Sequence, residues 1–266
     1  MGNVLIEVNE VKATGRFIDC RFSLADTTLG KQQFEQGHMK GAVYFDLEDD
    51  LSDMTKISSG RHPMPEKSSL LALFEGAGLT FDDTIYVYDG GGEPFAARGY
   101  YMLVYAGFPD VYIVNGGFDA LVEAGFEVTT EVASFAPSVI TPMWNESIYA
   151  SREDVFAVTK GSCDALLVDA RAAKRYAGEF EPLDPVAGHI PTAMNFDWEQ
   201  LKTGGKLVVT DDLLTQVPKD HELVVYCGSG VTASPLYATL KEAGYDKVKL
   251  YVGSYSDWIN EHEVEK

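Results

Sequence analysis

The sequence predicts an α/β protein of two tandem domains, each a parallel sheet flanked by helices. Three observations support this fold class. The chain repeats itself on the scale of a domain, short apolar runs alternate with helix-like segments, and the composition (266 residues, 45% hydrophobic, 23% charged) is that of a globular protein. Alternation of strand, helix and strand implies parallel strands with helices on both faces of a sheet.

The internal repeat consists of four blocks that recur in the same order. Residues 17–21 match 167–171, 37–46 match 188–197, 85–89 match 223–227, and 106–118 match 243–255. Such self-similarity indicates a duplicated domain. Between the copies, Pro137 and Pro142 are typical of an extended linker. We therefore expect an N-terminal domain at 1–130, a linker at 131–147 and a C-terminal domain at 148–266.

The second copy illustrates the expected elements. In chain order they are a helix at 152–160, strands at 165–168 and 223–226, a helix at 233–243 and a strand at 248–252. Ser151 is a suitable N-cap for the first helix, and Gly244 stands in the usual position after the second. The apolar run at 223–226 is typical of a strand buried on both faces.

The charge of the chain limits its partners. It has 41 acidic and 21 basic residues, a net charge of −20. Such a chain repels nucleic acid and anionic lipid surfaces, so we expect neither as a partner. A small anionic substrate would need arginines placed locally, which is feasible because salt screens charges over about 8 Å.

Cysteine content and hydropathy indicate a compartment. Three cysteines in 266 residues do not make a disulfide scaffold, which predicts a reducing cytoplasm. No apolar run approaches the ~20 residues of a membrane helix. Residues 1–7 lack the basic head and apolar stretch of a secretion signal. We expect a cytoplasmic monomer that does not bind membranes.

Cys227 opens the most informative loop, between an apolar strand and a helix; the residues that follow it are Gly228, Ser229, Gly230, Val231 and Thr232. In open α/β sheets, ligands bind beyond the carboxyl ends of the strands. Glycines allow successive backbone N–H groups to turn inward as an anion-binding nest, and the start of the next helix adds positive potential. Both effects favour a thiolate, so the loop predicts a reactive cysteine. A lone cysteine is otherwise usually a small buried hydrophobic residue, an interpretation that suits Cys20 and Cys163.

The residues near Cys227 narrow its chemistry. A phosphatase loop needs an arginine six positions after the nucleophile, where this chain has Ala233. A redox pair needs a second cysteine, where the chain has Ser234. Residues 90–92 are glycines but lack the lysine of a P-loop, and no Cys/His grouping has metal-ligand spacing, so we expect no metal and no cofactor. A solitary thiolate in an amide cradle suits the acceptance and transfer of one atom.

The residues at 227–233 resemble the active-site loop of 3-mercaptopyruvate sulfurtransferases, and the duplicated pattern resembles the two-domain rhodanese family over nearly the whole chain. The segments 60–63, 168–171 and 188–191 also resemble landmarks of that family. The resemblance implies two tandem rhodanese-like domains. The first is catalytically silent, because Asp89 stands where the second domain has Cys227.

The resemblance implies a ping-pong sulfur transfer. The thiolate of Cys227 would take the outer sulfur of a small anionic donor, 3-mercaptopyruvate or thiosulfate, and become a persulfide. A thiol, a thioredoxin-like protein or cyanide would then remove that sulfur. The backbone of Gly228, Gly230, Val231 and Thr232 would bind the donor and hold the charge of the persulfide.

Further roles are carried over from the family. Arg175 matches the arginine that grips the carboxylate of the donor. The second arginine usual in the mercaptopyruvate enzymes is replaced here by Leu183, which leaves the choice of donor open. Arg171 could substitute in donor binding, although a structural ion pair at the end of its strand is the alternative.

Ser229 and His62 match members of a proposed serine–histidine–aspartate proton relay, whose acid would be Asp46, Glu48 or Asp49. His62 lies in a stretch that only the first copy has, so we expect it to reach Cys227 across the interface between the domains. Four further residues occupy equivalent sites in both copies and are expected to be structural: His38, His189, Asp19 and Asp169.

Two other functions remain open. A sulfur-carrier or persulfide-sensing module would bind partners without efficient turnover. A phosphatase is a distant third, given the missing arginine.

Overall fold

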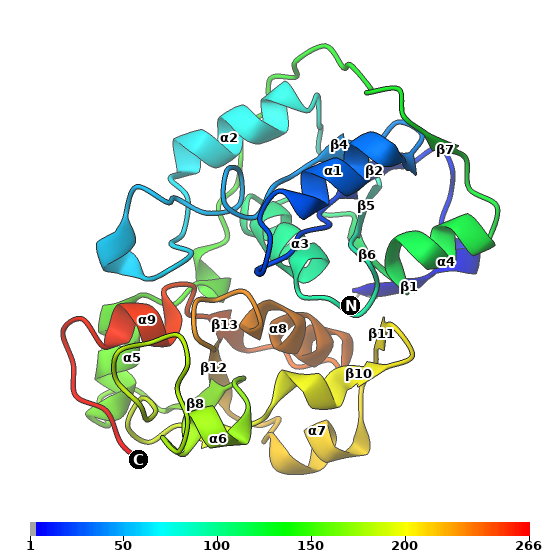
Figure 1. Cartoon of the computed structure of the whole chain (residues 1–266). Helices are drawn as coiled ribbons and strands as arrows, with labels where there is room; N and C mark the ends of the chain where they lie inside the picture. The colour runs from blue at the N-terminus through cyan, green and yellow to red at the C-terminus, as the bar shows by residue number, and fades with distance from the viewer. Residues whose placement is uncertain (1–3) are drawn as a thin grey trace. The chain divides into compact units, whose positions relative to one another are not determined.

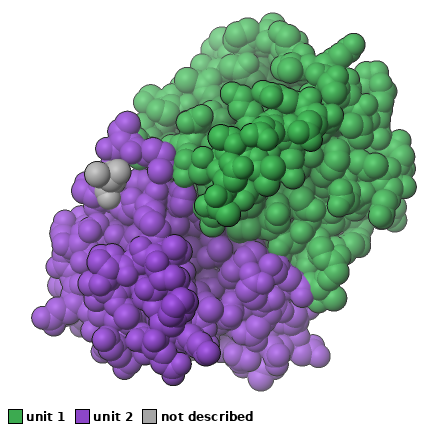
Figure 2. Space-filling model, viewed as in Figure 1, with its two compact units in different colours: residues 1–53, 65–145, 203–207 green, residues 54–64, 146–202, 208–266 purple. Residues whose placement is uncertain are grey.

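Two parallel β-sheets organise the chain, one in each of the two units into which its contacts divide (Figures 1 and 2). The computed structural model describes residues 4–266; residues 1–3, at the start of the expected N-terminal domain and of the stretch without a secretion signal, lie outside the described part. Unit 1 comprises 1–53, 65–145 and 203–207, and unit 2 comprises 54–64, 146–202 and 208–266. Residues 54–64 therefore pack with the second copy of the repeat, although they belong in sequence to the first.

Unit 1 contains a five-stranded sheet in the order β1-β6-β5-β2-β4, in which all neighbours are parallel. β3 and β7 form a separate antiparallel pair. The elements are β1 (Leu5–Glu7), η1 (Val8–Glu10), β2 (Arg16–Asp19), α1 (Leu29–Gln36), β3 (His38–Met39), β4 (Val43–Tyr44), α2 (Lys67–Gly76), β5 (Ile85–Tyr88), α3 (Phe95–Tyr105), β6 (Val111–Asn115), α4 (Gly117–Glu123) and β7 (Val128–Thr129).

The central strand β5 is buried along its whole length, which explains its nearly continuous apolar sequence. On one face, Phe17, Tyr86 and Tyr88 form a core with residues of α1 and α4. On the other face, Val87 lies against Gly99 of α3. Figure 1 shows helices on both sides of this sheet. The arrangement confirms the predicted fold class.

Unit 2 contains a four-stranded parallel sheet in the order β13-β12-β8-β9. Its elements are η2 (Ile57–Ser59), η3 (Glu146–Ile148), α5 (Arg152–Thr159), β8 (Ala165–Asp169), α6 (Ala173–Tyr176), β9 (Met194–Asn195), η4 (Trp198–Leu201), α7 (Asp211–Gln216), β12 (Glu222–Tyr226), α8 (Ala233–Glu242), β13 (Val248–Leu250) and α9 (Ser254–Trp258). A two-stranded ribbon, β10 (Lys202–Thr203) and β11 (Lys206–Leu207), leads from unit 2 into the segment grouped with unit 1.

The two helices that the sequence predicts in unit 2, α5 and α8, begin at the predicted residues and end one residue earlier than predicted. The Ser151 hydroxyl accepts the backbone N–H of Asp154, whose carboxylate accepts the N–H of Ser151, so both cap the start of α5. After α8 the backbone of Gly244 takes a φ of 76°, which favours glycine. β13 ends two residues earlier than expected, because the chain turns after Leu250 toward α9.

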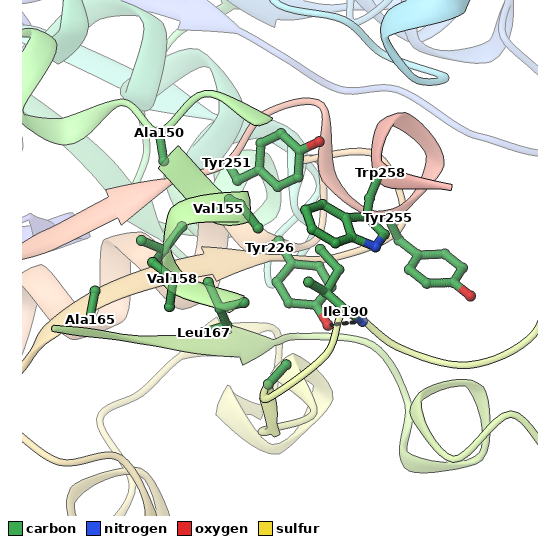
Figure 3. Close-up of a cluster of buried hydrophobic side chains, with 12 residues drawn as sticks. Ala150, Val155, Val158, Ala165, Leu167, Ile190, Tyr226, Tyr251, Tyr255 and Trp258 are labelled. Carbon is green, nitrogen blue, oxygen red and sulfur yellow. Dashed lines mark hydrogen bonds between the residues drawn. The ribbon is translucent and has the colours of Figure 1, made fainter. Parts of the chain in front are cut away.

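The core of unit 2 brings β8, β12, α5 and α9 together (Figure 3). Tyr226, Tyr255 and Trp258 are among its largest members. The Tyr226 hydroxyl accepts the backbone N–H of Ile190 at 3.1 Å, the dashed line in Figure 3. This core fixes the end of β12, directly before Cys227.

The matched histidines have matched structural roles. His38 Nδ1 lies 2.7 Å from the carbonyl oxygen of Phe34 and its ring stacks on that phenylalanine. His189 Nδ1 lies 2.9 Å from the carbonyl oxygen of Tyr176 and stacks on that tyrosine. Each ring therefore ties a helix to the segment that follows it. Separately, none of the helices within residues 4–266 combines the length and apolar character needed to cross a bilayer.

Candidate active site

Cys227 stands at the carboxyl end of β12, between strands β13 and β8 of the sheet. Its side chain is buried. Its backbone N–H donates to Ser254 Oγ at 3.1 Å, and its carbonyl oxygen accepts the N–H of Tyr255 at 3.0 Å. The turn that starts α9 therefore fixes the backbone of the cysteine on both sides.

The loop after Cys227 turns its amides inward. Gly230 has a φ of 75°, and a Cβ there would lie 2.2 Å from the carbonyl oxygen of Val252, so only glycine fits. Its N–H donates to Cys227 Sγ at 3.1 Å. Four other N–H groups have no acceptor in the described part of the chain: those of Gly228, Ser229, Val231 and Thr232. Most of this loop is buried, and buried N–H donors without a partner are well placed to receive an anion.

Ser229 and His62 form a pair beside this loop. His62 Nδ1 lies 2.8 Å from Ser229 Oγ, and both side chains are buried. Because residues 54–64 pack within unit 2, the two residues meet inside that unit and not by the expected route between domains. The segment is fastened there, since the N–H of Arg61 donates to Ser256 Oγ at 3.0 Å and Asn260 Nδ2 donates to the carbonyl oxygen of Ser58 at 3.0 Å.

The three carboxyl groups considered as partners of His62 belong to unit 1. Asp46 caps its own turn, since its carboxylate accepts the backbone N–H groups of Glu48 and Asp49 and the hydroxyl of Tyr44.

Two arginines reach the loop. At the position that a Cβ of Gly228 would occupy, Arg61 Nη2 is 2.6 Å away and Arg175 Nη2 is 3.3 Å away. Arg61 pairs with Asp184, and Arg175 pairs with Glu181 and Asp184. The absence of a side chain at Gly228 therefore lets both guanidinium groups approach the residue next to the nucleophile.

Carboxylates hold these arginines in place. Burial acts to raise the pKa of Glu181, but hydrogen bonds from Arg175 and from the backbone of Leu183 outweigh it, so that pKa lies below its ordinary value. Burial raises the pKa of Asp184, although Arg61 acts in the opposite direction. Leu183 itself is exposed.

Arg171 has a structural position. Its side chain is fully buried, its Nε and Nη2 donate to Asp169, Nη2 also donates to the carbonyl oxygen of Gly188, and Nη1 donates to Glu181. In unit 1, Arg21 binds Asp19 and the carbonyl oxygen of Gly37 in the same way. A contact repeated in both units serves the fold, so we leave Arg171 out of the proposed donor contacts and keep the alternative, the strand-end ion pair.

The other two cysteines differ from each other. Cys20 is buried against α3, and burial raises the pKa of its thiol well above the ordinary value. Cys163 is exposed, so the prediction of a buried hydrophobic residue is wrong for it. It lies in the turn between α5 and β8, and a turn packs against no core.

Sequence reasoning missed three residues of this site: Ser254, which binds the backbone of Cys227, Arg61, which lies beside Gly228, and Asp184, which binds Arg61. Arg61 lies in the segment 60–63, beside His62, and Asp184 follows Leu183, but no local pattern marks either residue. Within residues 4–266, no group of three or more His, Cys, Asp or Glu side chains is arranged to hold a metal ion.

Comparison with known proteins decides the family. A model described as "Rhodanese-like domain" matches residues 5–124 and 155–261. The chain belongs to this family. It is 37% identical over 254 residues to the "Probable 3-mercaptopyruvate sulfurtransferase" of Pseudomonas aeruginosa, covering 92% of this chain and 89% of that protein. It is 34% identical over 250 residues to SseB of Mycobacterium tuberculosis, provisionally named a thiosulfate sulfurtransferase, covering 92% and 87%.

A solved structure agrees. The crystal structure of SseA from Escherichia coli, titled as a 3-mercaptopyruvate enzyme with the rhodanese fold, superposes with a TM-score of 0.82 and 27% identity over 96% of this chain and all of that one. The predicted tandem rhodanese-like fold and the predicted sulfurtransferase class are confirmed.

Proposed function

We propose that this rhodanese-like protein carries a sulfane sulfur on Cys227 from a small anionic donor, 3-mercaptopyruvate or thiosulfate, to a thiol acceptor. The observation that carries the proposal is the position of Cys227 Sγ in a buried loop where, among the described residues, the N–H groups of Gly228, Ser229, Val231 and Thr232 have no acceptor. The names of the Pseudomonas and Mycobacterium relatives support the two donors.

The first half-reaction loads the cysteine. The thiolate of Cys227 attacks the outer sulfur of the donor, and a sulfur–sulfur bond forms. With 3-mercaptopyruvate the carbon–sulfur bond breaks, its electron pair leaves on the pyruvate enolate, and the enolate takes up a proton to give pyruvate. With thiosulfate the sulfur–sulfur bond of the donor breaks and sulfite leaves. The loop amides stabilise the charge on the persulfide, as fixed dipoles do in other active sites.

Ser229 and His62 supply the proton in this scheme. The hydroxyl of Ser229 donates to the enolate as it forms, and His62, 2.8 Å away, replaces that proton. Sulfite is a stable anion and needs no proton to leave. The pair is therefore proposed to serve 3-mercaptopyruvate and to be dispensable for thiosulfate.

The second half-reaction unloads the cysteine. The thiolate of an acceptor attacks the outer sulfur of the persulfide, the persulfide bond breaks, and Cys227 leaves as a thiolate ready for the next cycle. Cyanide would accept the same sulfur as thiocyanate. Unit 1, with Asp89 at the equivalent position, takes no part in the bond changes.

Intact-mass measurement after exposure to each donor tests the proposal. We expect the protein and the control Cys163→Ser to gain the mass of one sulfur, and Cys227→Ser to gain none. A sulfur bound elsewhere, or not bound at all, would contradict the proposal. If Cys227 is loaded but steady-state transfer to dithiothreitol is near zero with both donors, the protein is instead a sulfur carrier.

A further inference from the structure

Two guanidinium groups converge beside the nucleophile from segments far apart in sequence. Arg61 comes from residues 54–64, directly after η2, and Arg175 comes from α6. Relative to the position of a Cβ on Gly228, Arg61 Nη2 lies at 2.6 Å and Arg175 Nη1 and Nη2 lie at 3.6 and 3.3 Å. Both guanidinium groups therefore lie within 4 Å of the position that a Cβ atom of Gly228 would occupy.

Each of these arginines keeps donors that bind nothing else. Arg61 Nη1 donates to Asp184, and among the described residues its Nη2 has no acceptor. Arg175 uses Nε and Nη2 on Glu181 and Asp184, and within residues 4–266 its Nη1 has none. The side chain of Arg61 is 31% exposed and that of Arg175 is 18% exposed. The two side chains are therefore partly open to solvent, in contrast to the enclosed side chain of Arg171.

The carboxylates of Asp184 and Glu181 orient the two guanidinium groups. They bind only some of the N–H donors and leave the others available. Asp184 binds Arg61 through one oxygen and Arg175 through the other. Glu181 binds Arg175 and Arg171. In a chain with a net charge of −20, an anion is attracted only where N–H donors and guanidinium groups gather. The N–H groups of the loop after Cys227 and the available N–H donors of Arg61 and Arg175 together make such an anion-binding site.

We propose that Arg61 is the second arginine that binds the sulfur donor at this site. It supplies the guanidinium group that is missing at Leu183, which is exposed and apolar. The inference rests on the proposed function and deepens it. Its ligand is the oxyanion end of a small sulfur donor, because a guanidinium binds two oxygens of a carboxylate or a sulfonate side by side. The chain thus keeps two arginines at the donor site, one of them from a different segment.

Single-turnover loading of Cys227 tests the role of Arg61. The donor concentration for half-maximal loading is measured with 3-mercaptopyruvate and with thiosulfate, in the full chain and in Arg61→Ala, Arg61→Lys and the control Arg16→Ala. Arg16 lies at the start of β2 in unit 1, where it pairs with Asp83 and donates to the carbonyl oxygens of residues 77 and 78. The discharge of preloaded persulfide by dithiothreitol, a neutral thiol, is measured in parallel.

We expect Arg61→Ala to raise the half-maximal donor concentration roughly ten- to hundredfold, the loss of one charge-assisted hydrogen bond, without slowing discharge. Arg61→Lys, which keeps the charge beside Asp184 but not the planar fork, should show a smaller increase. Arg16→Ala should match the unaltered protein. A loss confined to one donor would identify the carboxylate or the sulfonate as the group that Arg61 holds.

The outcomes separate the two proposals. If the unaltered protein loads but Arg61→Ala loads at the same donor concentrations, the role of Arg61 is overturned and the sulfur-transfer function stands. If Arg61→Ala slows discharge as much as loading, the residue is structural and the inference fails. If the unaltered protein never loads, both proposals fall together.

Discussion

Two loops of equal length follow equivalent strands in the two units, and they use their backbone N–H groups in opposite ways. Asp89 follows β5 and Cys227 follows β12, and in each case the next helix begins six residues later, at Phe95 and at Ala233. In unit 1 the Asp89 carboxylate accepts the N–H groups of Gly91 at 2.9 Å and Ala96 at 3.0 Å. In unit 2 the sulfur accepts one N–H, that of Gly230.

The difference fits the proposed roles of the two copies, in which only the second carries sulfur. The loop of unit 1 encloses its own carboxylate, which occupies the N–H groups of Gly91 and Ala96 in the folded protein. In the proposed reaction, the unoccupied N–H donors of the unit 2 loop would receive the charge that forms on the persulfide, which is where fixed dipoles lower a barrier.

A second difference concerns the residue at the start of the helix that packs against each loop. Gly117 of unit 1 has a φ of 63°, and the equivalent Ser254 of unit 2 has a φ of 58°, which is unusual for a residue with a side chain. The Ser254 hydroxyl accepts the N–H of Cys227 and donates to the carbonyl oxygen of Tyr251 at 2.8 Å. Strained residues of this kind often serve a site. Here the strain places a hydroxyl below the nucleophile.

The largest effect is expected when the catalytic loop loses its hydroxyl. The substitution Ser229→Gly gives the loop of unit 2 a glycine, the residue that unit 1 has at the equivalent position, Gly91. Transfer from 3-mercaptopyruvate should fall by about 10²-fold, the lower end of the effect of a positioned proton donor. Transfer from thiosulfate should stay nearly unchanged, because sulfite needs no proton. Steady-state rates with both donors check this, and equal losses would remove the proton-transfer role.

A smaller effect is expected at the strained serine. Ser254→Gly, which copies Gly117, should slow persulfide formation roughly tenfold, because one hydrogen bond that positions Cys227 is lost. Relief of the strain offsets the lost bonds, so the free energy of unfolding should change by less than about 1 kcal/mol. Ser254→Ala is the matched control, since it loses the same hydroxyl and keeps the strain; it should be equally slow and less stable. Full activity in both variants would show that the hydroxyl does not position the cysteine.

The smallest effect on turnover is expected in the silent loop. Asp89→Asn should leave sulfur transfer unchanged. Its effect lies in stability, because burial raises the pKa of Asp89 from an ordinary 3.8 to about 7. The folded protein therefore holds a proton that the unfolded chain releases between these values, and this group lowers the free energy of unfolding as the pH rises from about 4 to 7.

Urea unfolding at pH 5 and pH 8 measures that contribution. The unaltered protein should lose more stability between the two pH values than Asp89→Asn does, since the amide does not ionise. If the free energy of unfolding has the same pH dependence in both proteins, the pKa of Asp89 is not raised in the folded protein. A change in turnover would mean that unit 1 is not silent.

The sequence predicted the confirmed fold, and it leads to Cys227 as the proposed nucleophile, because both inferences depend on local patterns. Apolar runs and caps set the ends of β12 and α8, and the glycines after Cys227 indicated an amide cradle before any fold was known. It did not predict Arg61 as a neighbour of Gly228, because residues 228 and 61 are 167 positions apart and no spacing rule links them. Nor could it separate the roles of Arg171 and Arg175, which have the same charge and differ only in burial and partners.

The amino-acid order alone thus determined the duplication, the parallel sheets and the cysteine that differs between the copies, since periodicity and turn chemistry act over short stretches of chain. Only the tertiary structure decided which unit residues 54–64 join, which arginines keep free N–H donors, and that a serine takes a left-handed conformation under the nucleophile. These depend on packing between distant segments, where the hydrogen bonds available to each group are set by neighbours that the local sequence does not name.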